Sequence, residues 1–321
     1  MERKYYAGID VGGTKISGAL ATAEGKIISR VKSPTPKNAS PNNIINIIAD
    51  LLEELLYAAD LKKKNLGGVG IGIPGIIDTS KGKVLRTPNM LLSGTNLQRK
   101  LEIKLNVRCA LGNDVNVGML GEKWLGAIKK TRNAVGLFIG TGVGAGIIIN
   151  DTLVTGNHGA AAELGHMIIQ EDGAQCSCGN KGCLEALVGR WAIERDIRKA
   201  IQKGKKTIIT KILDKKNSPI KSKILREAIK KQDALTMAIL TKAANNLGVA
   251  CISIRHIFDP KMIVLGGGVM EACGDFILPI VKKTVQKDKF FSDIGRCEIV
   301  ASKLGDDAIV LGAIYLIKNQ L

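Results

Sequence analysis

One histidine and three cysteines lie close together near the middle of the chain. His166 is followed by Cys176, Cys178 and Cys183. Thiolate sulfur and imidazole nitrogen are the usual ligands of tetrahedral zinc, and one His with three Cys fills all four positions. The alternative is a chance cluster of small buried cysteines. Because glycines between the cysteines permit tight turns, the spacing favours a structural zinc site that leaves no position for substrate.

Two carboxylates flank this cluster. Glu163 lies shortly before His166, and Glu185 follows soon after Cys183. Each carboxylate oxygen can accept a hydrogen bond, so the two glutamates and the imidazole could grip neighbouring hydroxyls of a polyol. The other histidines have no such companions, and we expect His158 on a surface loop and His256 in a structural role within a helix.

Three glycine-containing turns follow apolar strands and could bind phosphate, because glycine lets backbone N–H groups approach oxygens closely. Asp10 stands just before the first turn and would repel phosphate, but it could hold a hydrated Mg²⁺. Each turn alone could be an ordinary tight turn, and none matches the P-loop or dinucleotide fingerprints. Together they predict nucleotide binding. The turn residues are Gly12, Gly13, Thr14 and Lys15; Gly140, Thr141, Gly142, Val143 and Gly144; and Gly266, Gly267 and Gly268.

Asn113 and Asp114 follow an apolar stretch at residues 107–111 and precede a predicted helix. Asp114 could serve as the N-cap of that helix. A carboxylate at a strand end could equally act as general base on a hydroxyl, and phosphoryl transfer needs little more than positioning, a metal and a base.

The elements that must position these residues alternate between strands and helices. A strand–turn–strand pattern occurs at residues 6–21 and again at 134–150, about 130 residues later. This repetition predicts a duplicated domain with a cleft between the halves. Helical periodicity covers residues 42–59, 115–126 and 234–258, and buried strands are expected at 68–75 and 262–265. The alternation indicates an α/β fold.

Composition limits the function further. A chain of 321 residues, 45% hydrophobic and 24% charged, is typical of a globular protein with two domains. The net charge of +18 suggests nucleic acid, but the basic stretch at 195–231 carries apolar residues at helical spacing, and only 3% aromatics leaves few stacking platforms. We therefore expect no nucleic-acid partner. With neither a signal peptide nor an uninterrupted apolar run of ~18 residues, the sequence predicts a cytoplasmic protein without a membrane partner.

Taken together, these residues resemble the ROK family (repressor, open reading frame, kinase), and within it the bacterial glucokinases. The resemblance extends from Tyr6 to about Gly312. Five segments carry it in order: residues 10–15 are similar to the phosphate-1 motif, 140–146 to phosphate-2, 163–166 to the E-x-G-H element, 176–185 to the zinc signature, and 265–269 to the adenosine motif.

The resemblance implies duplicated actin-like ATPase (ribonuclease H-like) domains that form two lobes around a cleft. Residues 1–122, with the C-terminal helix 308–321 packed back on them, would form the small lobe, and 123–307 the large lobe with its zinc-bound loop. It implies ATP-dependent phosphorylation of a hexose at the 6-hydroxyl, glucose to glucose 6-phosphate, with Mg²⁺ and structural Zn²⁺, in a homodimer or tetramer. Asp114 would deprotonate the hydroxyl. The sugar would be held by Asn89, Asn113, Asp114, Glu163, His166 and Glu185, with His166 also binding zinc.

Two alternatives stay open. The sugar could be N-acetylmannosamine, N-acetylglucosamine, fructose, mannose or allose. A sugar-responsive transcriptional regulator is less favoured, because the first phosphate motif begins at Asp10 and leaves no room for an N-terminal helix-turn-helix.

The chain also departs from the family pattern. Ala162 stands where a glycine usually precedes the glutamate, and Val115 and Val117 stand where alanines are common, so packing near the sugar site should differ.

Overall fold

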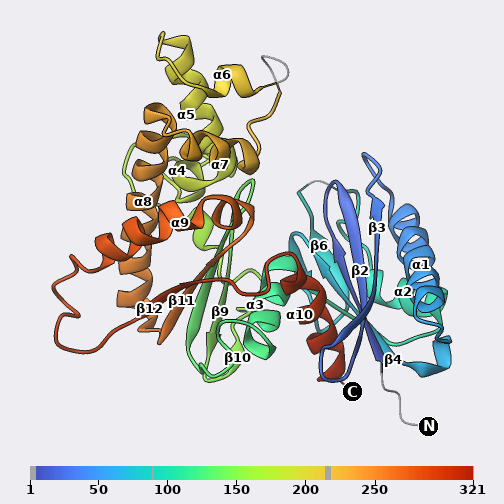
Figure 1. Cartoon of the computed structure of the whole chain (residues 1–321). Helices are drawn as coiled ribbons and strands as arrows, with labels where there is room; N and C mark the ends of the chain where they lie inside the picture. The colour runs from blue at the N-terminus through green and yellow to red at the C-terminus, as the bar shows by residue number, and fades with distance from the viewer. Residues whose placement is uncertain (1–4, 89, 214–217, 321) are drawn as a thin grey trace. The chain divides into compact units, whose positions relative to one another are not determined.

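The computed structural model describes residues 5–88, 90–213 and 218–320 (Figure 1). The chain forms two compact units. Unit 1 comprises Met1–Lys130, Leu153–Ala161 and Asp306–Leu321, and unit 2 comprises Thr131–Thr152 and Ala162–Gly305. Each unit is built on a five-stranded sheet accompanied by helices, which confirms the α/β class expected from the sequence.

The sheet of unit 1 has the strand order β3-β2-β1-β4-β7. The first three strands are antiparallel neighbours, whereas β4 runs parallel to β1, and β7 parallel to β4. A small antiparallel pair, β5–β6, lies outside this sheet. The strands are β1 (Tyr5–Val11), β2 (Lys15–Thr22), β3 (Ile27–Pro34), β4 (Leu66–Ile73), β5 (Ile76–Asp78), β6 (Lys83–Arg86) and β7 (Cys109–Asn113).

Helices cover both faces of this sheet. The amphipathic helix α1 buries its apolar residues, among them Ile44, Ile48 and Leu52, in one core with Ile9 and Ile71 of the sheet. Strand residues alternate in direction, so Gly8 and Gly70 face α10 instead. A Cβ on Gly70 would lie 1.8 Å from the Ala313 carbonyl oxygen, so this helix can pack closely only on glycine. The helices are α1 (Pro41–Ala58), η1 (Lys63–Asn65), α2 (Leu97–Leu105), α3 (Asp114–Trp124) and α10 (Asp307–Lys318).

The sheet of unit 2 has the order β10-β9-β8-β11-β12 and repeats the topology of the first. The antiparallel hairpin β8–β9 corresponds to β1–β2, and the parallel strands β11 and β12 correspond to β4 and β7. The repeated strand–turn–strand pattern in the sequence is therefore the same hairpin in two similarly connected sheets. The strands are β8 (Ala134–Ile139), β9 (Val143–Ile149), β10 (Thr152–Leu153), β11 (Met262–Gly266) and β12 (Glu298–Ala301).

The longest helix of unit 2 is α8, which packs against α4, α5, α7 and α9. Within the described ranges it is the one helix whose length and hydropathy would allow a membrane span. Its contacts with four other helices are those of a core helix, and a Cβ on its Gly248 would lie 2.5 Å from Thr284 of α9. The helices of unit 2 are η2 (Leu164–His166), α4 (Glu185–Val188), α5 (Arg190–Gln202), α6 (Ile209–Ile212), α7 (Ser222–Lys230), α8 (Ala234–Phe258) and α9 (Gly268–Val285).

Candidate functional site

Asp10 and Asp114 lie at the same edge of the unit 1 sheet. The register pairs Asp10 with Gly72 on β4, and Gly72 with Gly112 on β7, so the carboxyl ends of these parallel strands meet. Burial raises the pKa of Asp10 to about 7, and the negative charges of Asp114 and Asp306 act in the same direction, while Lys15 opposes them. The two carboxylates predicted from separate motifs are thus electrostatic neighbours.

Asn113, not Asp114, caps helix α3. The Asn113 Oδ1 accepts a hydrogen bond from the Asn116 backbone N at 3.0 Å, and its Nδ2 donates to the Gly75 carbonyl at 2.9 Å. The alternative interpretation of Asp114 as the N-cap is therefore wrong. Asp114 occupies the first helical position, where its Oδ1 accepts from the Val115 backbone N at 2.9 Å. The partial positive charge of the helix N-terminus stabilises a carboxylate at this place.

The first glycine turn joins β1 to β2 and is closed by a hydrogen bond from the Gly12 N to the Lys15 carbonyl at 3.0 Å. Gly13, Thr14 and Lys15 are exposed. Thr35 at the end of β3 braces the turn, since its Oγ1 donates to the Gly12 carbonyl at 2.7 Å and its N to the Thr14 carbonyl at 3.0 Å. The sequence did not reveal Thr35, because the contact follows from strand pairing and not from a local motif.

The second and third glycine turns lie at one edge of the unit 2 sheet. They follow β8 and β11, which are parallel neighbours with Gly266 paired to Phe138. Gly267 has a φ of +84°, and a Cβ there would lie 2.7 Å from the Ile139 carbonyl oxygen, so this close approach requires glycine. Within the second turn the Gly140 N donates to the Gly142 carbonyl at 2.9 Å, and Val143 and Gly144 begin β9.

The start of helix α5 also braces the second turn. The backbone N of Arg190 donates to the Gly140 carbonyl at 3.1 Å, and that of Trp191 to the Thr141 carbonyl at 3.2 Å. The Arg190 Nη2 donates to the Thr141 Oγ1 at 2.7 Å. Sequence reasoning missed Arg190, which belongs to none of the motifs and comes to the turn only through the fold.

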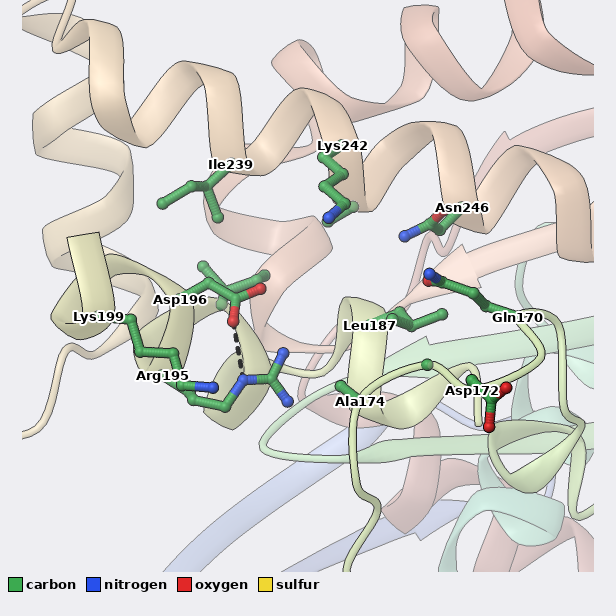
Figure 2. A pocket seen from close by; sticks show the side chains of 13 residues that line it. Gln170, Asp172, Ala174, Leu187, Arg195, Asp196, Lys199, Ile239, Lys242 and Asn246 are labelled. Atoms are coloured by element: carbon green, nitrogen blue, oxygen red, sulfur yellow. Dashed lines mark hydrogen bonds and ion pairs between the residues drawn. The ribbon is translucent and has the colours of Figure 1, made fainter. Parts of the chain in front are cut away.

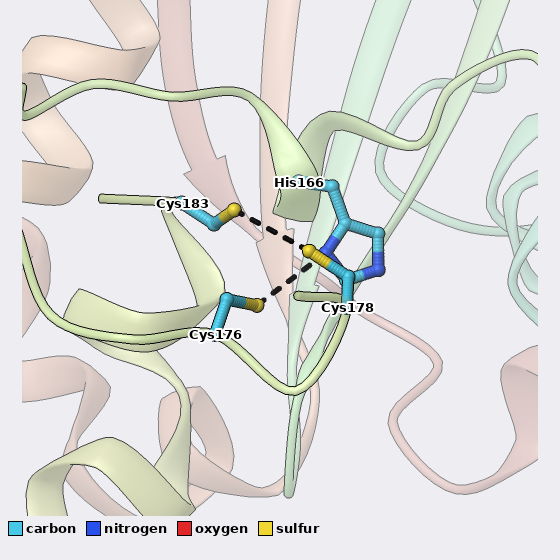
Figure 3. A group of neighbouring side chains, drawn as sticks. All are labelled: His166, Cys176, Cys178 and Cys183. Atoms are coloured by element: carbon cyan, nitrogen blue, oxygen red, sulfur yellow. Dashed lines mark hydrogen bonds between the residues drawn. The ribbon is translucent and has the colours of Figure 1, made fainter. Parts of the chain in front are cut away.

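His166, Cys176, Cys178 and Cys183 bring their four ligand atoms within 4.8 Å of one another (Figure 3). The Cys176 Sγ lies 3.7 Å from the His166 Nδ1, and the Cys178 Sγ lies 3.7 Å from the Cys183 Sγ. A tetrahedral zinc with Zn–S bonds of about 2.3 Å would place its sulfur ligands about 3.8 Å apart. The residues therefore fit the ion, with the Nδ1 of His166 as the ligand nitrogen.

Two glycines shape the cysteine loop. Gly179 and Gly182 have φ values of +99° and +74°, in the left-handed region that favours glycine. A Cβ on Gly182 would also lie 1.7 Å from the Gln170 carbonyl oxygen. Their turns let the Cys176 N donate to the Asn180 carbonyl at 2.8 Å, which folds the loop back on itself.

Glu185 links the cysteine loop to the second glycine turn. Its Oε1 accepts from the Ser177 Oγ at 3.1 Å, and its Oε2 accepts from the Val143 N at 3.0 Å. Glu163 lies one turn of backbone before His166, whose N donates to the Glu163 carbonyl at 2.9 Å. Ala162, the residue before Glu163, has a φ of +66°. The chain therefore carries alanine in place of the family's usual glycine at a position where the backbone favours glycine.

The predicted sugar-binding residues thus form two groups. Glu163, His166 and Glu185 lie in one segment of unit 2, and Asn113 and Asp114 lie at the edge of the unit 1 sheet. Asn89 lies outside the described residues. His158 is exposed, as expected.

Unit 2 also contains a cavity of about 310 Å³ beside α5 and α8 (Figure 2). Charged and amide side chains line it, including Asp172, Arg195, Lys199 and Lys242. None of the predicted site residues lines this cavity, and its two lysines are exposed at the surface. The cavity is therefore separate from the candidate site.

Residues 6–320 match the ROK family, and the chain belongs to it. The chain is 33% identical over its full length to a glucokinase from Halalkalibacterium halodurans, of which it covers 97%. It is 34% identical to a glucokinase from Thermotoga maritima, with 98% of this chain and 97% of that relative aligned. A xylose repressor from Caldicellulosiruptor bescii is 31% identical, with 98% of this chain and 78% of the repressor aligned.

A solved structure of a ROK family glucokinase from Streptomyces griseus, in complex with glucose and AMPPNP, has the same fold. Its TM-score is 0.85 at 28% identity, over 97% of this chain and 98% of that one. The resemblance drawn from the five sequence motifs is confirmed.

Proposed function

We propose that the protein is an ATP-dependent sugar kinase that converts glucose to glucose 6-phosphate. The similarity to two glucokinases along their whole length carries this proposal. A structural relative that holds glucose together with an ATP analogue supports the same substrates.

Asp114 is the proposed general base. Its carboxylate would accept the proton of the sugar 6-hydroxyl while the hydroxyl oxygen bonds to the γ-phosphorus and the bond from that phosphorus to ADP breaks. Two observations support the role. Asn113 takes over the capping of α3, and the first turn of the helix fixes the Asp114 carboxylate at the end of β7.

The sugar hydroxyls would bind Asn89, Asn113, Asp114, Glu163, His166 and Glu185. Zinc would be held by the three cysteines and the Nδ1 of His166, and it supplies structural cross-linking of the loop. With the Nδ1 committed, the proton of a neutral imidazole stays on the Nε2, which can donate to a sugar oxygen. His166 would then serve both the metal and the substrate.

The glycine turns would bind the nucleotide. Gly13 and Thr14 of unit 1 are exposed residues of a glycine turn. The backbone N–H groups of this turn and of the two turns of unit 2 are suited to phosphate oxygens and to the adenosine moiety. Asp10 is the proposed partner of Mg²⁺, which neutralises charge on the transferring phosphates. Burial is the main reason that the pKa of Asp10 is raised, and repulsion from the Asp114 carboxylate adds to it; a cation there would also relieve this repulsion.

ADP release measured across glucose, mannose, fructose, allose, N-acetylglucosamine and N-acetylmannosamine tests the substrate. We expect the highest kcat/KM with glucose. A higher value for an N-acetylated hexosamine would replace glucose with that sugar and leave the kinase assignment standing.

The other candidate function is sugar-responsive repression, which the similarity to a xylose repressor favours. An electrophoretic mobility shift assay with genomic DNA fragments separates the two functions. Tight, sequence-specific binding together with no ADP release on any sugar would favour the repressor. The family resemblance further suggests a homodimer or tetramer, which light scattering would measure.

A further inference from the structure

Arg190 is the first residue of helix α5 and lies directly on the second glycine turn. Its backbone N donates to the Gly140 carbonyl at 3.1 Å, and its Nη2 donates to the Thr141 Oγ1 at 2.7 Å. Because the Thr141 oxygen accepts from the guanidinium, the hydroxyl hydrogen of Thr141 can be donated to another group. Arg190 and the exposed residue Thr141 together therefore present several hydrogen-bond donors.

The same guanidinium reaches toward the third glycine turn. The Arg190 Nη1 lies 3.5 Å from the carbonyl oxygen of Ile220, two residues before the start of α7. Ser222, the first residue of α7, has its Oγ 3.9 Å from the position that a Cβ on Gly268 would take. Arg190 thus contacts the second turn directly and also contacts the segment that leads into α7, whose first residue lies near the third turn.

Arg190 differs from its neighbours on α5 in having no carboxylate partner. Arg195 pairs with Asp196 at 2.7 Å, and Arg198 pairs with Glu194 at 2.7 Å. Within the described residues no ion pair involves Arg190, whose side chain is half-buried. A guanidinium has five N–H donors, and the contacts with Thr141 and Ile220 engage two nitrogens. A cation in this position, beside the exposed residue Thr141, is suited to an anion.

We propose that Arg190 binds a phosphate group of the donor nucleotide. The inference rests on the proposed kinase function and adds a residue to it. A guanidinium contacts phosphate oxygens in bidentate fashion, and the hydrogen bond to Thr141 fixes its orientation in the absence of nucleotide. None of the five segments of this chain that resemble family motifs contains this arginine.

Binding of adenosine, AMP, ADP and a non-hydrolysable ATP analogue tests the proposal, measured by calorimetry on the wild type, Arg190→Ala and Arg190→Lys. Adenosine should bind all three proteins equally. Along the series AMP, ADP and ATP analogue, Arg190→Ala should bind about 10- to 100-fold more weakly than the wild type from the first nucleotide that carries the phosphate group contacted by Arg190. This factor is what the loss of a hydrogen bond to a charged group costs. Arg190→Lys keeps the positive charge but loses the planar, bidentate guanidinium, so its affinity should lie between those of the wild type and Arg190→Ala.

Lys199→Ala is the matched control. Lys199 is exposed on the same helix, so this variant loses one positive charge away from the turn and should bind every ligand as the wild type does. Equal losses for adenosine and for the ATP analogue in Arg190→Ala would overturn the proposal in favour of a structural role. Unchanged affinities in Arg190→Ala would overturn it outright. A wild type that binds none of the nucleotides would instead remove the proposed function.

Discussion

Gly142 is the point where the second glycine turn meets the carboxylate of Glu185. A Cβ at this position would lie 2.2 Å from the Glu185 Oε2 and 3.0 Å from its Cδ. The backbone of Gly142 does not lie in the left-handed region, so alanine is sterically allowed there except for this contact. Gly142→Ala must therefore push the carboxylate aside and break its hydrogen bond from the Val143 N.

The expected cost follows from the groups that lose their partners. Val143 is 6% exposed, and a buried N–H left without a partner costs about 1–3 kcal/mol. The half-buried Glu185 can be hydrated again after it moves. Replacing glycine restricts the unfolded chain and returns about 0.4–1 kcal/mol. We therefore expect Gly142→Ala to lower the free energy of unfolding by about 1–2 kcal/mol.

Urea unfolding of the zinc-loaded protein measures this difference. Gly140→Ala is the matched control, because it lies in the same turn and, apart from its own chain neighbours, no described residue has an atom within 4 Å of the added Cβ. It should be as stable as the wild type or slightly more stable. A double-mutant cycle with Glu185→Ala isolates the contact, since truncating Glu185 should cost less once Gly142→Ala is present. Equal stability of the Gly142 and Gly140 variants would refute the reasoning.

Three further predictions concern single positions. Ala162 has a φ of +66°, which costs a non-glycine residue about 1–2 kcal/mol. Ala162→Gly should therefore stabilise the protein by about 0.5–1 kcal/mol after the greater chain entropy of glycine in the unfolded state is subtracted. A lower stability of this variant in urea unfolding would contradict this prediction. Cys178→Ser should lower the zinc content measured by elemental analysis and weaken glucose binding. Cys297→Ser is the control, because Cys297 lies outside the cluster, and this variant should retain the metal. Full zinc content in Cys178→Ser would show that the ligand set is wrong. The pKa of Asp10 is raised from 3.8 to about 7, so the folded state binds the proton of this carboxyl group more tightly than the unfolded state does. The stability that this proton contributes is fully present below about pH 4 and is lost as the pH rises through 7. In metal-free protein, Asp10→Asn should therefore gain stability relative to the wild type between pH 4 and 7, and parallel stability curves would exclude the shift.

Features that depend on local sequence could be predicted well. The helix expected at residues 234–258 is α8 with the same bounds, because its apolar periodicity and the Asp233 cap are both local. The cysteine cluster was also predictable, since its ligands follow one another within a short loop shaped by Gly179 and Gly182. In both cases neighbours in the sequence are neighbours in space.

Contacts between distant segments could not be predicted. Thr35 on Gly12, Arg190 on Thr141 and Asp306 near Asp10 each join elements whose approach is decided by strand order and helix packing. The N-cap of α3 could not be decided from the sequence for a related reason. Asn113 and Asp114 are both good capping residues, and the end of β7 decides which one takes that place.

We propose above all that this chain transfers phosphate from ATP to the 6-hydroxyl of glucose with Asp114 as the base. Formation of glucose 6-phosphate, detected with a dehydrogenase specific for that product, tests it most directly on the zinc-loaded wild type and on Asp114→Asn. We predict steady product formation by the wild type, and a kcat lower by ~10²–10⁴ in a variant that still binds glucose. Wild-type turnover in the folded Asp114→Asn variant, or no glucose 6-phosphate from the wild type with ATP and Mg²⁺, would contradict the account.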